Sequence, residues 1–198
     1  MINLDLAQGS AEWFSARAGR PTASNFDRII TDEGKPSKQR QKYLYELAGE
    51  AIAGPSVNGY QSFAMERGKV VEAEARTLYE VLHDVEVKQV GLCFSDEKKL
   101  WSASPDGLFG ELGLEIKCPL IHTQVGYLLQ DKLPQEYFPQ AQGGMFVTGL
   151  KEWEFFSYYP GLRPVIHRVK RDESYISNLG TELRQFFSEL QEVIRKIR

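Results

Sequence analysis

The sequence predicts an α/β (α+β) domain in which helices flank a short, mixed central sheet. Three features predict this class. Helix-capping residues precede apolar-periodic segments in the first third, short strand-like segments follow in the middle, and the C-terminal segment has one long apolar helical face. No repeat, low-complexity segment or linker interrupts the 198 residues, so we expect one domain, residues 1–198.

The first helices are predicted from their capping residues. Thr22 or Ser24 is expected to cap a short helix that ends at Ile30. Ser37 is expected to cap a longer helix that ends at Ala53, where a Gly-Pro pair follows directly and stops it.

Later helices are predicted from apolar spacing. Between Gln61 and Leu82, apolar residues recur on one helical face, with Glu72 one position away from this stripe. A further helix is expected from about Gln135 to Val147. The last helix, Glu173 to Arg198, has a long apolar face made of Ile176, Leu179, Leu183, Phe186, Phe187, Leu190 and Ile194.

Strands are predicted where residues alternate or where short apolar segments end in turns. A Pro-Asp-Gly turn at 105–107 joins two of them, and Pro160-Gly161 joins another two. The expected strands are Val85–Val90, Leu100–Ala103, Gly113–Cys118, Trp153–Tyr159 and Pro164–Val169.

Composition excludes several classes of protein. No run of 18 apolar residues is present, so we expect no membrane-spanning helix. The first residues lack a signal-peptide pattern, and two cysteines, Cys93 and Cys118, are too few for a disulfide scaffold or a zinc site. A reducing cytoplasm is the expected compartment.

The charge distribution is uneven. The net charge of −3 argues mildly against a nucleic-acid partner. However, residues 15–45 contain seven Lys or Arg and three acids, whereas residues 66–116 contain eleven acids and six bases. A basic surface beside an acidic centre suits an enzyme that grips phosphates and holds cations, although charge alone favours ordinary solvated faces.

The chemistry is concentrated in two short segments, residues 104–108 and 113–119. Side chains at i and i+2 of a strand share a face, so Glu115 and Lys117 are expected to project together, with Asp106 reaching the same place from the preceding turn. Neighbouring carboxylates repel unless a cation lies between them, and Mg²⁺ prefers such oxygen ligands. The pattern alone is more typical of a surface hairpin with a salt bridge, but Leu114 and Ile116 indicate a buried strand where Glu and Lys are costly.

Pro-Asp followed by Glu-x-Lys resembles the core of the restriction-endonuclease-like (PD-(D/E)XK) nuclease superfamily, and so implies its fold. Longer motifs are similar to those of the phage lambda-type exonucleases, the YqaJ-like viral recombinases, over roughly residues 10–175. Five blocks carry the resemblance in order: Trp13–Gly19 with Thr22-Ala23-Ser24, Gly68–Glu72 with Ala75-Arg76, Ser104–Leu108, Gly113–Pro119, and Tyr137–Gln142 with Met145–Thr148.

The resemblance implies a role for each matching residue. Asp106 and Glu115 would ligate two Mg²⁺ ions, for which Mn²⁺ substitutes, with the main-chain carbonyl of Ile116 as a further ligand. Glu72 would hold a metal-bound water or complete the ligand shell, and Lys117 would orient and activate the attacking water. Gln140, or alternatively Gln142, would position water or the scissile phosphate. The positions that match the family's binding site for a terminal 5′-phosphate are Arg17, Ser24 and Ser104, and an Arg fork with hydroxyls suits a phosphate dianion.

Two positions depart from the family pattern. Arg67 stands where an aromatic residue precedes the glycine of the helix motif. Pro139 lies inside the Gln-bearing segment, where it is expected to kink or start a helix.

The resemblance implies a processive 5′→3′ exonuclease that digests one strand of linear duplex DNA to nucleoside 5′-phosphates. The 3′ overhangs would serve recombination by strand annealing, in a phage or prophage protein of a bacterial cytoplasm. The implied partners are DNA with a 5′-phosphorylated end, two further copies in a ring-shaped trimer, and a single-strand-annealing protein. We expect the basic residues of 15–45 to line the channel of that ring.

Two alternatives remain open. A structure-specific or restriction-type endonuclease of the same fold would cut closed circular duplex. A non-catalytic DNA-binding module would use its acidic cluster for a structural ion and release no nucleotide, with or without EDTA.

The histidines are expected to be structural or exposed, and the aromatic strand residues to be structural. His83, His122 and His167 share no metal-ligand spacing. The aromatic residues between Trp153 and Tyr159 are expected to pack in the core rather than to stack on bases.

Overall fold

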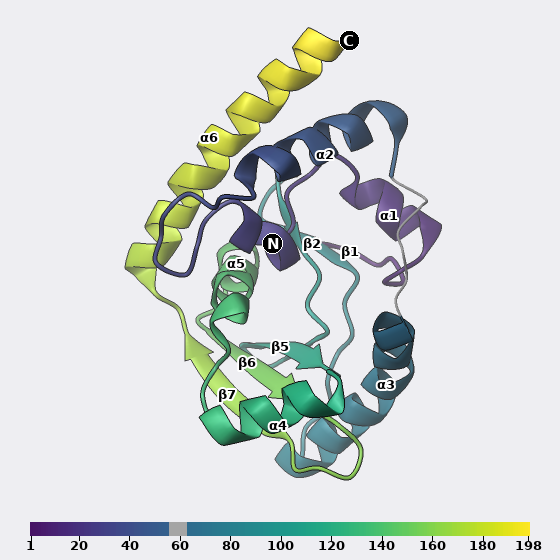
Figure 1. The fold of residues 1–198 in the computed structure, drawn as a ribbon. Coiled ribbons are helices and arrows are strands. Elements are labelled where there is room, and N and C mark those ends of the chain that lie inside the picture. The colour runs from purple at the N-terminus through teal and green to yellow at the C-terminus, as the bar shows by residue number, and fades with distance from the viewer. Residues whose placement is uncertain (56–62) are drawn as a thin grey trace.

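The computed structural model describes residues 1–55 and 63–198 and confirms the predicted α/β class, with a mixed sheet at its centre (Figure 1). The central sheet has the strand order β4-β5-β6-β7 and consists of β4 (Gly107–Phe109), β5 (Leu112–Lys117), β6 (Glu152–Ser157) and β7 (Val165–Lys170). β5 and β6 are parallel, and the other neighbours are antiparallel. A second, antiparallel sheet is formed by β1 (Ile2–Leu4), β2 (Leu92–Phe94) and β3 (Ser102–Ala103).

A helical crossover connects the parallel strands β5 and β6, as such a pair requires. It contains α4 (Ile121–Gln130), the 3₁₀ turn η2 (Gln135–Tyr137) and α5 (Phe138–Thr148). Pro139 lies in the first turn of α5. Of the two expected effects, a kink or a helix start, this proline therefore has the second. α4 is a helix that the sequence analysis did not predict.

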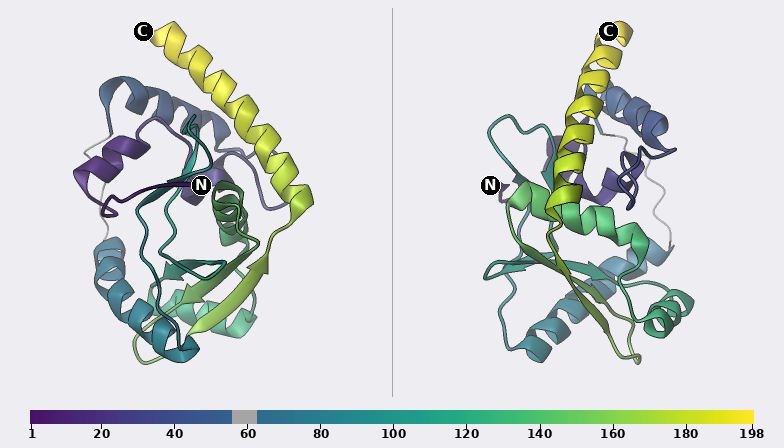
Figure 2. Two further views of the ribbon diagram at one scale, coloured as in Figure 1. Left: turned by 180° about the vertical axis from the view of Figure 1, so that it is seen from behind. Right: turned by 90° about the vertical axis from the view of Figure 1, so that its left-hand side faces the viewer.

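The two faces of the central sheet are covered by different helices. Ala75 and Tyr79 of α3 (Phe63–His83) pack with Leu114, Ile116 and Phe156 on one face. Ala141 and Met145 of α5 pack with Trp153 on the other face, and Tyr127 of α4 packs there with Phe155. In the right-hand view of Figure 2 the sheet is seen nearly edge-on between these layers.

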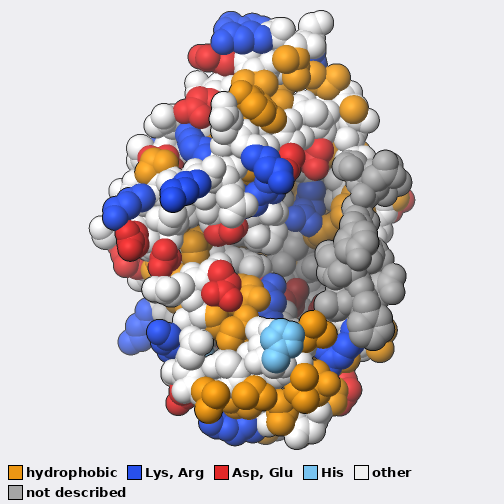
Figure 3. All heavy atoms as spheres, in the orientation of Figure 1, with side chains coloured by type: hydrophobic (Ala, Val, Ile, Leu, Met, Phe, Trp, Pro, Cys, Tyr) orange, Lys and Arg blue, Asp and Glu red, His pale blue; other side chains and the backbone are white. Residues whose placement is uncertain are grey.

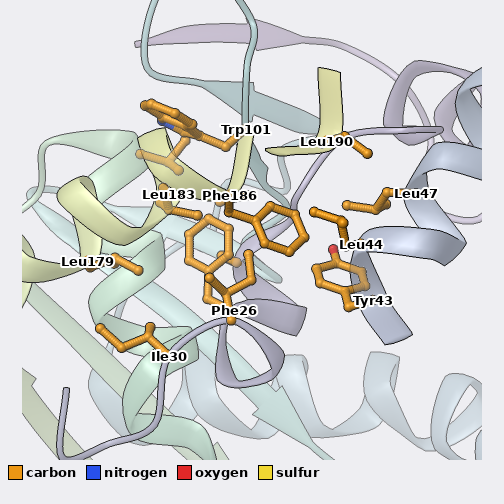
Figure 4. Close-up of a cluster of buried hydrophobic side chains, with 14 of the residues drawn as sticks. Phe26, Ile30, Tyr43, Leu44, Leu47, Trp101, Leu179, Leu183, Phe186 and Leu190 are labelled. Carbon is orange, nitrogen blue, oxygen red and sulfur yellow. The ribbon is translucent and has the colours of Figure 1, made fainter. Parts of the chain in front are cut away.

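The largest apolar cluster lies above the sheet and joins the N-terminal helices to the C-terminal one (Figure 4). α6 (Glu173–Ile197) packs along α2 (Arg40–Ala53) and buries its predicted apolar face, including Leu183 and Phe186. The 3₁₀ helix η1 (Ala23–Arg28) adds Phe26 to this cluster and also contacts α5. The short α1 (Ala11–Arg17) is capped by Ser10, whose hydroxyl accepts a hydrogen bond from Trp13 N–H.

Several predicted boundaries are wrong at the N-terminal side. The short helix is a 3₁₀ helix that ends at Arg28 rather than at Ile30, with Thr22 as its N-cap residue. α2 begins at Arg40, because the Ser37 hydroxyl accepts a hydrogen bond from Gln39 N–H and closes a turn before the helix. The helix predicted from Gln61 is described from Phe63 onward, and Gln61 itself lies outside the described residues.

The predicted strand Val85–Val90 is also wrong. This segment makes one isolated bridge, between Lys88 and Leu108. The adjacent Val87 N–H donates to the Glu80 side chain instead of to a strand, so the ladder does not extend. The strand in this region is β2, which comes directly after it.

Two glycines make room for Trp153, the large side chain between β6 and α5. A Cβ added at Gly113 or Gly144 would lie 2.2 Å or 2.5 Å from atoms of the Trp153 ring. Trp153 is 1% exposed, so the ring cannot move aside into solvent. These glycines therefore set the distance between α5 and the sheet.

We predict that Gly144→Ala destabilises the protein by about 1–3 kcal/mol, the usual cost of overpacking a core. Gly126→Ala in α4 is the matched control, because nothing lies within 4 Å of its added Cβ. That control should stabilise the helix by roughly 0.5–1 kcal/mol. Urea unfolding measures both, and equal effects of the two substitutions would contradict the packing account.

Candidate active site

The described residues form a pocket of about 180 Å³ between the two sheets, the N-terminal helices and α5. The face drawn in Figure 3 is hollowed near its centre, where both basic and acidic side chains are visible. The predicted residues that line the pocket are Arg17, Ser24, Ser104, Asp106, Glu115, Lys117 and Gln140. The structure thus brings together residues from four of the five sequence blocks.

β5 positions Glu115 and Lys117 on the same face, as predicted. Leu114 and Ile116 point to the opposite face and are buried against α3. Glu115 is 5% exposed, and its Oε1 lies 2.5 Å from Lys117 Nζ. The predicted pair therefore occupies a buried strand and is not part of a surface hairpin.

Two hydrogen bonds with the backbone of β5 hold Asp106 beside that strand. Its Oδ2 accepts from Ile116 N–H at 2.7 Å, and its own N–H donates to the Leu114 carbonyl at 3.0 Å. The N–H and C=O of one residue in an extended strand point to the same side. The Ile116 carbonyl consequently points to the side of β5 on which Asp106 lies, as its predicted role requires.

The surroundings at the end of β5 disfavour a negative charge on the Asp106 carboxyl group. The pKa of Asp106 is well above its usual value, because burial and the nearby Glu115 and Glu72 disfavour its charge more than Lys117 favours it. Burial acts to lower the pKa of Lys117, but Glu115 and Asp106 outweigh it and raise that pKa. Lys117 is therefore a protonated ammonium at neutral pH.

Glu72 lies beside the pocket rather than in its lining. Its Oε1 pairs with Arg76 Nη2 at 2.7 Å, one turn further along α3. It is still close enough to Asp106 and Cys118 to contribute to the raised pKa of each. α3 thus brings a third carboxylate to the end of β5.

The two candidate glutamines point to different places. Gln140 lines the pocket. Gln142 is fully buried, donates to the Lys170 carbonyl at 2.9 Å and accepts from Asp172 N–H at 3.0 Å. Gln142 therefore holds α5 to the end of β7, and Gln140 is the glutamine at the site.

Arg17 occupies the other half of the pocket. Its Nη2 donates to the hydroxyls of Thr22 (3.2 Å) and Ser24 (3.3 Å), and its guanidinium stacks 3.8 Å from the Trp13 ring. Among the described residues no carboxylate forms an ion pair with it, and burial lowers its pKa, opposed by Tyr43 and Glu50. A half-buried cation held by hydroxyls and a ring is suited to an anion from outside the chain.

The other basic residues of 15–45 lie outside this pocket, and their place along the channel of a trimer stays a prediction. All of this segment is described, and of its Lys and Arg residues Arg17 alone lines the pocket. Arg28 pairs with Glu46 at 2.7 Å, and Arg40 with Glu189 at 3.1 Å. Arg20 donates to main-chain carbonyls. Arg28 thus joins η1 to α2, and Arg40 joins α2 to α6.

Three pocket residues were missed by the sequence analysis. Gln8 Nε2 donates to the carbonyls of Val90 (3.0 Å) and Pro105 (2.9 Å), next to Asp106. Trp13 Nε1 donates to the Ser104 hydroxyl at 3.1 Å. Thr22 is 5% exposed, and its hydroxyl lies 3.1 Å from that of Ser24. Trp13 and Thr22 lay within recognised motifs, whereas nothing in the sequence marks Gln8.

The aromatic strand residues pack in the core as expected, and of the histidines His83 is packed while His122 is exposed. Trp153, Phe155, Phe156 and Tyr158 are buried. His83 stacks on Tyr79, with ring centroids 4.3 Å apart, and lies away from the pocket lining. Of the part of the chain that the structure describes, no helix is both long and apolar enough to cross a bilayer.

The chain matches a family model and several solved structures. The model of the YqaJ-like viral recombinase domain matches residues 12–151. An alkaline exonuclease (LHK-Exo) from Laribacter hongkongensis is 33% identical, with a TM-score of 0.86 over 95% of this chain and 96% of that one. Its complex with dAMP is similar at 32% identity, with the same coverage and TM-score. No curated protein sequence matches the chain.

A more distant structure shares the fold. A phage-related exonuclease from Haemophilus somnus has a TM-score of 0.73 at 14% identity, over 90% of this chain and 96% of that one.

We predict that Asp106→Asn stabilises the metal-free protein at neutral pH. A carboxyl whose pKa is higher in the folded state contributes stability at low pH, and this is lost as the pH rises from its unfolded pKa of about 3.9 towards the folded pKa. The amide keeps an acceptor for Ile116 N–H and removes the repulsion from Glu115 and Glu72. In EDTA at about pH 8, melting should rise by roughly 2–4 °C, the shift that about 1 kcal/mol causes in a chain of this size.

The difference should shrink near pH 4, where the wild-type carboxyl is already protonated. Asp5→Asn is the matched control, because this aspartate is exposed and is not part of the pocket lining. A lower melting temperature for Asp106→Asn at neutral pH would show that burial of this charge is not the dominant cost.

Proposed function

Because the chain belongs to the YqaJ-like viral recombinase family, we propose that it is a Mg²⁺-dependent deoxyribonuclease that digests one strand of linear duplex DNA from the 5′ end. The family and the likeness to an alkaline exonuclease support a nuclease. The observation that carries the finer proposal is that Arg17 and the Asp106–Glu115–Lys117 group line the same pocket. An anion site and a cation site side by side suit one phosphate held at a chain end and the next one hydrolysed.

The donor set fits a magnesium ion. Asp106 and Glu115 present carboxylate oxygens, and the Ile116 carbonyl points to the same side. Within the described part of the chain, no three His, Cys, Asp or Glu side chains are gathered into a ready-made metal cluster. Mg²⁺ tolerates this, because it usually takes one or two carboxylates and completes its shell with waters and substrate phosphate. Histidine and cysteine, the usual zinc donors, are absent from the pocket lining that the described residues form.

When bound, the metal would stabilise negative charge on the phosphate and lower the pKa of a coordinated water. The chain's own groups would do the rest. Lys117 is protonated and sits beside Glu115, so its ammonium can orient the attacking water through its rotatable donors. Gln140 can both donate to and accept from the same water, or its amide N–H can donate to the scissile phosphate. Holding these groups in place removes much of the entropic cost of the attack.

The terminal phosphate would be bound by Arg17, Ser24 and Ser104. The Arg17 guanidinium supplies paired N–H donors, and the hydroxyls of Ser24 and Thr22 can turn from each other to the phosphate. Trp13 keeps its ring under Arg17 and its indole N–H on Ser104. The dAMP complex of the similar exonuclease supports a site of this kind for a nucleoside monophosphate.

The Arg17 site beside the carboxylates and Lys117 favours an exonuclease over a restriction-type endonuclease or a non-catalytic binding module. A restriction-type endonuclease has no need of a terminal-phosphate site beside its carboxylates. A module with only a structural ion has no need of a protonated lysine there. A processive ring of three copies and a strand-annealing partner remain proposals that rest on the family.

We predict that nucleotide release requires Mg²⁺ or Mn²⁺ and fails with Ca²⁺, which binds oxygen ligands in looser and higher coordination. Lys117→Ala should bind DNA nearly normally but lose a factor of at least ~10² in turnover, a value typical of a positioned group that activates the attacking water. Lys151→Ala is the control, because that lysine is exposed and pairs with Glu173 at the surface. A Lys117→Ala rate above half that of the wild type would refute the assigned role.

We also predict that 5′-phosphorylated duplex is degraded faster than 5′-hydroxyl duplex, and that Arg17→Ala erases most of this difference. The reason is that the Arg17 guanidinium has no carboxylate partner among the described residues and would pair with the terminal dianion. Rates on the two substrates measure the effect, with the exposed Arg184→Ala as the matched control. Equal rates on both substrates in the wild type would rule out the phosphate site.

A further inference from the structure

Tyr137 lies over the lysine of the active site. The Lys117 Nζ is 5.2 Å from the centroid of the Tyr137 ring. An ammonium within about 6 Å of a ring is attracted to the negative face of the aromatic system. The same Nζ lies 2.5 Å from Glu115 Oε1. Lys117 is thus held by a carboxylate and by an aromatic ring.

The Tyr137 ring is itself held in place by the sheet. It packs against Phe155 with ring centroids 5.0 Å apart and planes at 31°. Phe155 is 1% exposed and is the register partner of Glu115 in the parallel pair β5–β6, so both point to the same face. Tyr127 of α4 completes the group, edge-on to Tyr137 at 6.5 Å. The ring over Lys117 is therefore fixed by packing that does not involve Lys117.

The backbone around Tyr137 also fixes its position. Tyr137 ends the 3₁₀ turn η2 and is the N-cap residue of α5. The next residue, Phe138, packs edge-on against Tyr175 of α6 with centroids 4.9 Å apart. Gln140 follows in the first turn of α5 and lines the pocket. One short segment thereby supplies both the ring over Lys117 and the amide in the pocket.

We propose that Tyr137 is a positioning residue whose ring holds the Lys117 ammonium where it orients the attacking water. This inference rests on the proposed nuclease function. Lysine has a flexible four-carbon stem, so its ammonium needs partners to stay in one place. Glu115 cannot give its full charge to Lys117 while it also binds a cation. The ring is the partner that stays the same with and without that cation.

The test compares Tyr137→Leu and Tyr137→Met with Tyr137→Phe. The two variants without a ring should lower kcat by about 10-fold, which corresponds to about 1.4 kcal/mol in the barrier. The KM for duplex DNA should stay within about twofold, because the ring acts on Lys117 and not on DNA binding. Tyr137→Phe keeps the ring and should retain at least half of kcat. Methionine fills the space flexibly and serves if the leucine variant does not fold.

Tyr127→Leu is the matched control. Tyr127 belongs to the same aromatic group, with its ring centroid 6.1 Å from that of Phe155. Its loss should lower the melting temperature at least as much as Tyr137→Leu but reduce kcat less than about threefold. In a Lys117→Ala background, Tyr137→Leu should cause no further loss, since the two residues act as one unit.

A readout without turnover separates positioning from general destabilisation. In the metal-free protein, the ring should shield the terminal methylene of Lys117, so its NMR signal should move in Tyr137→Leu and stay in Tyr137→Phe. An unmoved signal in Tyr137→Leu, an unchanged kcat, or equal losses in the Phe and Leu variants would each overturn the proposal. A wild-type protein that releases no nucleotide would instead refute the nuclease function.

Discussion

The site depends on one short attachment between a turn and a strand. Asp106 accepts a hydrogen bond from Ile116 N–H and donates its own N–H to the Leu114 carbonyl. These two contacts place its carboxylate beside Glu115 and on the side to which the Ile116 carbonyl points. They also hold the preceding Ser104 where the Trp13 indole reaches it. This attachment therefore links the Asp106–Glu115 half of the pocket to the half that contains Ser104 and Arg17.

The pocket keeps charges that the folded chain alone does not balance. Burial and neighbouring carboxylates raise the pKa of Asp106, and the Arg17 guanidinium is held by hydroxyls and a ring rather than by a carboxylate. Perturbed groups of this kind gather at functional sites because the missing partners come with the substrate or the cofactor. By contrast, Arg28 and Arg40 are paired within the chain and serve the fold. Whether a charged side chain has a partner within the chain thus distinguishes the candidate binding residues from those that stabilise the fold.

The sequence predicted the parts of this arrangement that depend on local periodicity. A period of two puts Glu115 and Lys117 on one face, and the apolar spacing of α6 predicted its buried side. Prediction from the sequence failed where contacts between distant parts of the chain determine the local structure. Val85–Val90 alternates, but Glu80 takes the Val87 N–H and leaves one bridge. Gln8 and Tyr137 act through residues far away in the sequence, Pro105 and Lys117, so no local pattern assigns them a role.

The central claim is that this pocket hydrolyses DNA from a 5′ end with a divalent metal ion. The most direct measurement uses linear duplex labelled at its 5′ ends beside closed circular duplex, each incubated with Mg²⁺ or with EDTA. The account predicts early release of labelled nucleoside 5′-phosphate from the linear duplex with Mg²⁺, none with EDTA, and an intact circle. Opening of the circle, or release of label that EDTA does not stop, would contradict it.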